Sequence, residues 1–194
     1  MAQEELFSEP SELPGGLVYQ PRFLTGAEEK ALLESIRTLD LREAQYKAFT
    51  AKRRVASFGA GYDFTENELT PAPTMAPFLA ELRDRIAPWA GAAAGEFGYA
   101  LVAEYRPGTQ LGWHRDVPHF ELLVGVSLAS AAKMRFRPYP PRKHDKIFTL
   151  DLEPRSAYVL KDDVRWKWQH SIAPTPQLRY SITFRTRAAE GLRR

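Results

Sequence analysis

Cysteine is absent from this sequence of 194 residues. Its absence excludes disulfides, zinc sites built from thiolates and catalysis by a cysteine nucleophile. Histidine is scarce, with four residues in the whole chain. A metal site here must therefore combine a few imidazoles with carboxylates.

Long apolar runs are also missing. No segment approaches the roughly 18 consecutive apolar residues that a membrane helix needs. The N-terminal stretch MAQEELFSEPSELPGG is acidic and has no apolar region of the kind found in secretory signals. We therefore expect a cytoplasmic protein that does not engage a membrane.

What is present is an ordinary globular composition, with 44% hydrophobic and 26% charged residues. The length suits one domain with a proper core. Residues 1–15 are polar and contain proline and glycine, which predicts a disordered leader. We expect a single domain over 16–187, a tail over 188–194 and a monomeric protein.

The net charge of +3 is unevenly distributed. Residues 131–146 (AAKMRFRPYPPRKHDK) carry six lysines and arginines against one aspartate, and residues 52–54 (KRR) form a second basic cluster. Such clusters suit a polyanion such as nucleic acid. Each cluster taken alone is equally compatible with a solvated charged rim.

Two helices are predicted in the first half of the chain. Thr25 stands three residues before Glu28, a capping-box pattern that opens a helix reaching about Ile36. Apolar residues at helical spacing predict a second helix over Met75–Ala87, ended by Pro88. Between the two, residues 53–74 look like a strand that leads into a loop rich in glycine and proline.

From Gly98 onward, short apolar or alternating runs follow one another, separated by turn residues. Many short strands at nearly even spacing favour a sandwich, a jelly roll or a barrel. The fold class expected is α+β, with the two N-terminal helices packed on an antiparallel β core.

A possible metal site lies in GWHRDVPHF, residues 112–120. In an extended segment, His114 and Asp116 point to the same side and could bind one cation. Two histidines and one carboxylate form the ligand set of non-haem Fe(II) oxygenases. His119, His144 and His170 are the possible third ligands, and we select His170 because a late strand can lie beside an early one in a rolled β core. An H-x-D pair alone is weak support for a metal site.

The last strand, RYSITFR (179–185), carries Arg179, Ser181, Thr183 and Arg185 on one face. Burying arginines on the inner face of a small β domain is costly unless an anion meets them, and a dicarboxylate would suit the guanidinium fork. An edge strand with its polar face in water is the alternative. Six strand residues span about 20 Å, so both arginines reach one small ligand only if the strand coils.

These residues together resemble the AlkB family of Fe(II)/2-oxoglutarate-dependent dioxygenases. The resemblance rests on ordered motifs: YRPG before HRD, a late HSI, and RYSITFR. It extends weakly upstream through GLVYQPRFLTGAEEKALLESI and FGAGYDF, and so covers most of residues 16–187. It implies a double-stranded β-helix (jelly roll) core and the cofactors Fe(II), 2-oxoglutarate and O₂.

The resemblance also implies roles for single residues. His114, Asp116 and His170 would hold the iron and so be the catalytic group. Arg179 would bind the distal carboxylate of 2-oxoglutarate with Tyr105, while Arg185 would lie beside the proximal carboxylate and Asp116. Two departures are visible: Ala103 replaces an asparagine that often helps to bind the cosubstrate, and Pro118 replaces a carboxylate that some repair members use to touch the base.

Contacts to the substrate are predicted from aromatic and basic residues. A lid over residues 51–65 would carry Tyr62, which matches the aromatic that stacks on the target base. Trp113 and Phe120 are further stacking candidates for an extruded base. Arg53, Lys133 and Arg135 would contact phosphates.

Three functions stay open. The first is oxidative dealkylation of N-alkylated bases in DNA or RNA, as in alkylation-damage repair or RNA demethylation. The second keeps the iron chemistry but acts on a protein or a small molecule, which the Pro118 departure favours. The third is a jelly roll that binds nucleic acid without catalysis.

Overall fold

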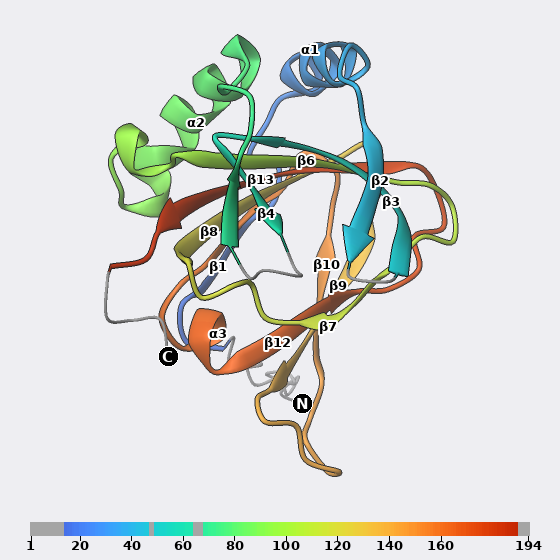
Figure 1. The fold of residues 1–194 in the computed structure, drawn as a ribbon. Coiled ribbons are helices and arrows are strands. Elements are labelled where there is room, and N and C mark those ends of the chain that lie inside the picture. Colours follow the sequence, from blue (N-terminus) through green and yellow to red (C-terminus); the bar gives the residue numbers. More distant parts are fainter. Residues whose placement is uncertain (1–13, 47–48, 64–67, 190–194) are drawn as a thin grey trace, which may run out of the picture.

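The computed structural model describes residues 14–46, 49–63 and 68–189. For residues 44–46, 49–51, 62 and 63 it describes the backbone alone. Most of the predicted leader (1–15) and tail (188–194) lies outside these ranges. Within them, two antiparallel sheets face each other and helices cover the outside of the larger sheet (Figure 1). No helix in these ranges is both long and apolar enough to cross a membrane.

The larger sheet has the strand order β1-β11-β8-β13-β6-β3-β2. Its strands are β1 (Leu17–Gln20), β2 (Arg42–Tyr46), β3 (Phe49–Phe58), β6 (Tyr99–Tyr105), β8 (Phe120–Leu128), β11 (Ala157–Leu160) and β13 (Arg179–Arg187). Because β13 pairs with β8 on one side and β6 on the other, it lies inside the sheet. The alternative of an edge strand with its polar face in water is therefore wrong.

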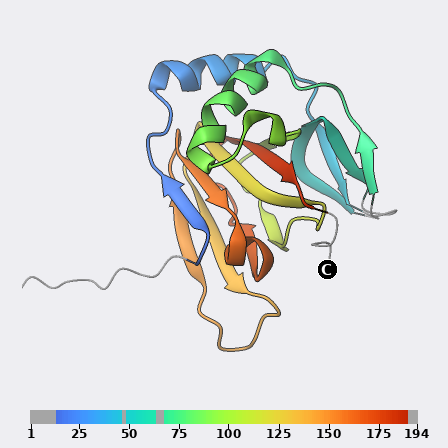
Figure 2. The ribbon, with the colours of Figure 1, turned by 90° about the vertical axis from the view of Figure 1, so that its left-hand side faces the viewer.

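The smaller sheet has the order β10-β9-β12-β7. Its strands are β7 (Leu111–His114), β9 (Ala132–Pro138), β10 (Phe148–Leu152) and β12 (Trp168–Ile172). Figures 1 and 2 show the connection between β9 and β10 projecting beyond the sheets, at the end of the molecule away from α1 (Gly26–Ile36) and α2 (Pro77–Ala90).

The segment after β3 differs from the prediction of a glycine- and proline-rich loop. It forms a hairpin of β4 (Ala60–Asp63) and β5 (Glu68–Pro71). Gly59, with φ at 79°, makes the tight turn out of β3, and its N–H donates to the carbonyl of Pro73. Glycine and proline here mark the ends of short strands, which the composition of the segment did not reveal.

Helix α1 (Gly26–Ile36) begins at the predicted capping box. The N–H of Glu28 donates to the Thr25 hydroxyl at 3.3 Å, and the N–H of Thr25 donates to the Glu28 carboxylate at 2.7 Å. Its buried residues Leu32 and Ile36 face the larger sheet.

Helix α2 runs over Pro77–Ala90, so the prediction that Pro88 ends it is wrong. Pro88 lies in the last turn, where its missing N–H removes one hydrogen bond. Ala87 and Ala90 are buried on both sides of it and favour the extra turn, which stops at Gly91 in the left-handed conformation. Two short helices were not predicted: η1 (Ala94–Glu96) and α3 (Asp162–Trp166).

The larger sheet is buried on both faces. In β13, successive side chains point alternately to the helices and to the smaller sheet. Ile182 and Phe184 pack with α1 and α2 in one apolar cluster. The opposite face carries Tyr105 and Ala103, which join Met134 and Phe136 of the smaller sheet in a second cluster between the sheets. The predicted α+β fold, a jelly-roll core with N-terminal helices on one face, is confirmed.

Candidate metal and cosubstrate site

Two of the predicted metal ligands meet across neighbouring strands. His114, at the end of β7, pairs directly with His170 in the middle of β12. The two ring centroids are 4.3 Å apart. His170 is buried and His114 is partly exposed, so the pair lies at the rim of the space between the sheets.

Asp116 completes the group from the connection that follows β7. Its Oδ1 lies 3.6 Å from Nε2 of His114 and 3.7 Å from Nε2 of His170. One donor atom from each residue lies within 4.8 Å of the other two. Two imidazoles and one carboxylate on one side of a cation leave its remaining positions open, as Fe(II) oxygenase chemistry requires.

Hydrogen bonds and burial keep these donors in the metal-binding form. Nδ1 of His114 lies 2.9 Å from the carbonyl of Gly112, which can only accept, so Nδ1 is the donor and the neutral ring presents Nε2 to a metal ion. Burial, followed by the charge of His114, lowers the pKa of His170 to about 3. His170 is therefore neutral near pH 7, as a ligand must be.

Arg185 orients the carboxylate. Its Nε donates to Oδ2 of Asp116 at 2.7 Å, which leaves Oδ1 toward the two histidines. Burial alone would raise the pKa of Asp116, but the charge of Arg185 and the interactions with both histidines hold it well below its usual range. Arg185 also lies over the Phe120 ring, 5.4 Å from its centroid.

Arg165 of α3 holds the segment that carries Asp116, a role that the sequence did not predict. Arg165 is 4% exposed, and its guanidinium donates to the carbonyls of Val117 and Phe120 at 2.6–3.2 Å. Burial lowers its pKa to about 10, and Asp116 opposes that shift. In the sequence, the position of this arginine within the tryptophan-rich run VRWKW was the feature that could have indicated a buried role.

A cluster of buried polar side chains lies on the inner face of the larger sheet, and we call it the candidate cosubstrate pocket. Arg179 is 1% exposed, and its Nε donates to the hydroxyl of Ser127 at 3.0 Å. Nη1 of Arg179 is buried and has no hydrogen-bond partner among the described residues. A buried cationic donor without a partner is costly, and a carboxylate is the ligand that satisfies it. The donor set therefore fits 2-oxoglutarate.

Tyr105 forms one wall of this pocket. Its ring centroid lies 4.9 Å from Cζ of Arg179. Burial would raise the pKa of Tyr105, but the charges of Arg53 and Arg179 lower it overall. Ala103, where the family often has asparagine, is buried and pairs with Ser181 across the strands, so no amide is available there.

Tyr158 of β11 is a second residue missed by the sequence. Its ring covers Gly125 so closely that a Cβ on Gly125 would lie 2.1 Å from Cζ of the tyrosine. Burial raises the pKa of Tyr158 to about 12. The phenol therefore stays protonated beside Arg179, as a neutral part of the pocket floor.

The predicted substrate residues are not all brought to the metal group. Trp113, Lys133 and Arg135 lie on the outer face of the smaller sheet, because Met134 and Phe136 occupy the inner face. Cζ of Arg135 and of Arg137 lie 5.2 Å and 4.4 Å from the centroid of the Trp113 indole ring.

The other three predicted substrate residues lie elsewhere. The side chain of Tyr62 is outside the described residues. Arg53 reaches the hydroxyl of Tyr105 in the cosubstrate pocket. Phe120 is buried, next to Tyr99 and Arg185. His119 and His144, the other histidines considered, do not belong to the metal-binding group.

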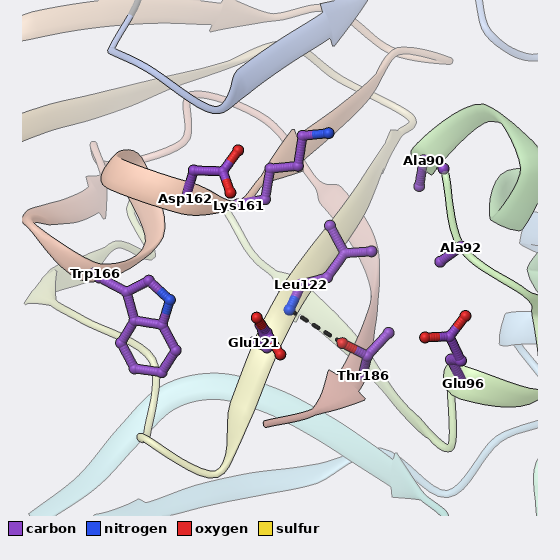
Figure 3. Close-up of a pocket in the computed structure, with 10 residues that line it drawn as sticks. Ala90, Ala92, Glu96, Glu121, Leu122, Lys161, Asp162, Trp166 and Thr186 are labelled. Carbon is purple, nitrogen blue, oxygen red and sulfur yellow. Dashed lines mark hydrogen bonds between the residues drawn. The ribbon is translucent and has the colours of Figure 1, made fainter. Parts of the chain in front are cut away.

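A separate surface pocket lies between α3, β8 and the end of α2 (Figure 3). Its polar lining includes Glu96, Glu121, Lys161 and Asp162. The residues that line it do not include His114, Asp116 or His170. They do not include Arg179 or Arg185 either. It is therefore distinct from the site described above.

Comparison with known proteins points to the same chemistry. The family model of the 2OG-Fe(II) oxygenase superfamily matches residues 16–185. An Arabidopsis thaliana protein named alkylated DNA repair protein ALKBH8 homolog is 30% identical over 186 residues, covering 81% of this chain and 50% of its own. Mouse tRNA (carboxymethyluridine(34)-5-O)-methyltransferase ALKBH8 is 28% identical over 170 residues, covering 84% of this chain and 25% of its own.

The chain thus spans half or less of the length of these two curated relatives. Among solved structures, OsALKBH1 superimposes with a TM-score of 0.73 at 14% identity, covering 90% of this chain and 97% of that one. This likeness supports the jelly-roll fold. The chain belongs to the 2OG-Fe(II) oxygenase superfamily, which implies Fe(II), 2-oxoglutarate and O₂ as cofactors, and it resembles AlkB-like members of that superfamily.

Proposed function

We propose that this enzyme oxidatively dealkylates N-alkylated bases in DNA or RNA. The observation that carries the proposal is the similarity, across more than four-fifths of the chain, to proteins whose names refer to alkylated DNA and to tRNA. The basic outer face of the smaller sheet adds support, because lysine and arginine side chains there suit a phosphate backbone.

The proposed roles of the residues follow from the geometry. His114, Asp116 and His170 bind the iron through the three converging donor atoms. Arg179 and Tyr105 bind the distal carboxylate of 2-oxoglutarate, and Arg185 keeps Asp116 ionised and oriented. Tyr158 and the apolar cluster between the sheets exclude water.

When bound, Fe(II) and 2-oxoglutarate supply the O₂-dependent oxidation of one C–H bond of the alkyl group. A hydroxylated N-alkyl carbon is a hemiaminal, which releases an aldehyde and leaves the free base. The protein's own task is to present that one C–H bond. Tyr62, Trp113, Lys133 and Arg135 stay our predicted substrate contacts for a nucleotide drawn out of its stack. Arg53 was predicted with them, but its contact with Tyr105 favours a different role.

The second candidate keeps the same chemistry on a protein or a small molecule. Pro118 favours it, because a proline there cannot supply the carboxylate that some repair members direct at the base. The complete metal group and both strand arginines argue against the third candidate, a non-catalytic nucleic-acid-binding protein.

The test is an aerobic assay with Fe(II), 2-oxoglutarate and a panel of N-methylated DNA and RNA oligonucleotides, scored for aldehyde and for succinate. We expect aldehyde from at least one oligonucleotide and none from His114→Ala. Consumption of 2-oxoglutarate without aldehyde from any oligonucleotide would favour the second candidate. Oligonucleotide binding without any consumption would favour the third.

Three broader predictions from the sequence accompany the proposal. We propose one catalytic domain over 16–187 flanked by a leader (1–15) and a tail (188–194). We also propose a monomeric and cytoplasmic enzyme. Size-exclusion chromatography with light scattering, limited proteolysis and cell fractionation address these three points separately.

A further inference from the structure

We propose that Arg53 is a second arginine of the cosubstrate pocket, which binds the distal carboxylate of 2-oxoglutarate together with Arg179. This inference rests on the cosubstrate site described under the proposed function. It reassigns Arg53 from a phosphate contact to a residue that selects the dicarboxylate.

The strand register places Arg53 beside the pocket. Arg179 of β13 pairs with Tyr105 of β6, and Ala103 of β6 pairs with Val55 of β3. Arg53 precedes Val55 by two residues, so it shares the face of Val55 and stands opposite Tyr105. The side chains of Arg53, Tyr105 and Arg179 thus stand in one row across three neighbouring strands.

The contacts agree with this register. Nη1 of Arg53 donates to the hydroxyl of Tyr105 at 3.4 Å. Cζ of Arg53 lies 6.0 Å from the Tyr105 ring centroid, and Cζ of Arg179 lies 4.9 Å from it. Both guanidinium groups therefore lie near the same phenol.

Both guanidinium groups have an unused buried donor. Nε of Arg53 and Nη1 of Arg179 are shielded from solvent and have no hydrogen-bond partner in the described ranges. No ion pair among the described residues includes either arginine. Two cations around a buried phenol need an anion, and one carboxylate has enough lone pairs to accept from both.

The neighbouring arginine shows that this placement is specific to position 53. Arg54 points to the other face of β3, where it donates to Glu104 and to the carbonyl of Leu41. Glu104 is thereby occupied on the far side of the sheet and cannot neutralise Arg53. Ala103 offers no polar side chain to the pocket, so Arg53 supplies a donor that this chain otherwise lacks there.

The experiment measures equilibrium binding of two keto acids to the Mn(II)-loaded protein by calorimetry. The keto acids are 2-oxoglutarate and 2-oxopentanoate, which has the same carbon chain without the distal carboxylate. We expect Arg53→Met to weaken 2-oxoglutarate about 10- to 100-fold, the range for losing a hydrogen bond to a charged group. Affinity for 2-oxopentanoate should change less than about twofold, since it has no group for Arg53 to bind.

Two variants serve as controls. Lys52→Met removes one positive charge from the adjacent exposed position and should leave both affinities unchanged. Arg53→Lys keeps the charge and should restore part of the 2-oxoglutarate affinity. Circular dichroism checks that each variant is folded.

Every other outcome counts against the inference. Unchanged 2-oxoglutarate affinity in Arg53→Met, or equal weakening of both keto acids, overturns the two-arginine site and leaves the proposed function standing. Weakened oligonucleotide binding with unchanged keto-acid binding would return Arg53 to the substrate side. Failure of the wild-type protein to bind 2-oxoglutarate would overturn both proposals.

Discussion

Asp116 uses its two oxygens for different purposes. Oδ2 accepts from Nε of Arg185, while Oδ1 faces both histidines. The carboxylate is buried, and burial alone would favour its protonated form. The charge of Arg185 therefore decides whether this ligand is ready for a metal ion near neutral pH.

Replacing Arg185 by methionine should make metal binding depend more steeply on pH. The folded pKa of Asp116 is lowered, so its contribution to stability is present above the unfolded value of about 3.9 and is lost as the pH falls through the folded value. Without Arg185, burial raises this pKa. We expect the apparent Kd for Mn(II) to rise more between about pH 8 and pH 6 than in the wild type. Titration followed by electron paramagnetic resonance measures it, and Arg187→Met, an exposed position on the same strand, should match the wild type.

His170 predicts a pH dependence of stability in the metal-free protein. Its pKa is lowered from 6.5 to about 3, so between these values only the unfolded state binds the proton. The free energy of unfolding should therefore fall by about 1.4 kcal/mol for each pH unit below 6.5 through this residue alone. His170→Gln should remove that slope, as measured by urea unfolding in the presence of a chelator. His144→Gln, at an exposed position, should retain it, and a slope equal to wild type in His170→Gln would refute the assignment.

At the scale of elements, the short helix α3 acts on the metal site through one residue. Arg165 binds the carbonyls of Val117 and Phe120, at the two ends of the connection after Asp116. The helix has only five residues, so its own hydrogen bonds contribute little to its stability. Its packing against β8 and β12 through this arginine positions the ligand.

Replacing Arg165 by methionine should lower the free energy of unfolding by about 2–4 kcal/mol, because the buried carbonyl of Phe120 and the partly buried carbonyl of Val117 lose a charged donor. Affinity for Mn(II) should also fall about 10- to 100-fold, the usual effect of losing a group that orients a ligand. Urea unfolding and metal titration measure the two effects. Lys167→Met, which removes an exposed ion pair with Asp163, should change stability by less than about 0.5 kcal/mol. Normal metal affinity in Arg165→Met would remove its positioning role.

The packing between the paired strands β8 and β11 depends on a glycine, Gly125, which stands opposite Tyr158. A Cβ at Gly125 would lie 2.1–2.4 Å from three atoms of the Tyr158 side chain. Gly125→Ala should therefore cost about 1–3 kcal/mol or more by overpacking, measured by urea unfolding. Gly95→Ala is the matched control, because nothing lies within 4 Å of the added methyl group. Equal stability of the two variants would mean that the ring moves aside freely.

Local patterns in the sequence predicted those features of the fold and the site that depend on residues close together in the chain. The capping box at Thr25, the alternation of RYSITFR and the pairing of His114 with a late histidine all rest on short-range spacing or on strand order. The contact of Arg53 with Tyr105 and the role of Arg165 were not predicted, because they depend on which distant strand or carbonyl each arginine meets. Trp113 illustrates the same limit, since the register shift between β7 and β12 next to it is invisible in the sequence.

For the molecule as a whole, charge is distributed unequally over the surface. Lys133, Arg135 and Arg137 line the outer face of the smaller sheet, and Arg142, Lys143 and Lys146 follow in the exposed β9–β10 connection. Helices α1 and α2 lie at the opposite end of the molecule (Figure 2). A nucleic acid would therefore meet the smaller sheet and its projecting connection, as the proposed function requires.

Replacing Lys133 and Arg135 together by glutamine should weaken oligonucleotide binding and lower the slope of log K against log salt by about two, one for each phosphate contact. Binding of 2-oxoglutarate should stay unchanged, because both residues lie outside the pocket. Fluorescence anisotropy at several salt concentrations measures the slope. The matched control replaces Lys30 of α1 and Arg83 of α2 by glutamine. This control should keep the wild-type slope of log K against log salt. An unchanged slope in the first variant would exclude this face as the phosphate contact.

The central claim is that three residues hold a metal ion next to a keto acid bound by buried arginine. A crystal structure of the complex with Mn(II) and 2-oxoglutarate, under anaerobic conditions, tests it most directly. We predict metal density in contact with Nε2 of His114, Oδ1 of Asp116 and Nε2 of His170, with the distal carboxylate of the keto acid on Arg179. Metal bound at other residues, or a keto acid whose distal carboxylate lies away from Arg179, would contradict it.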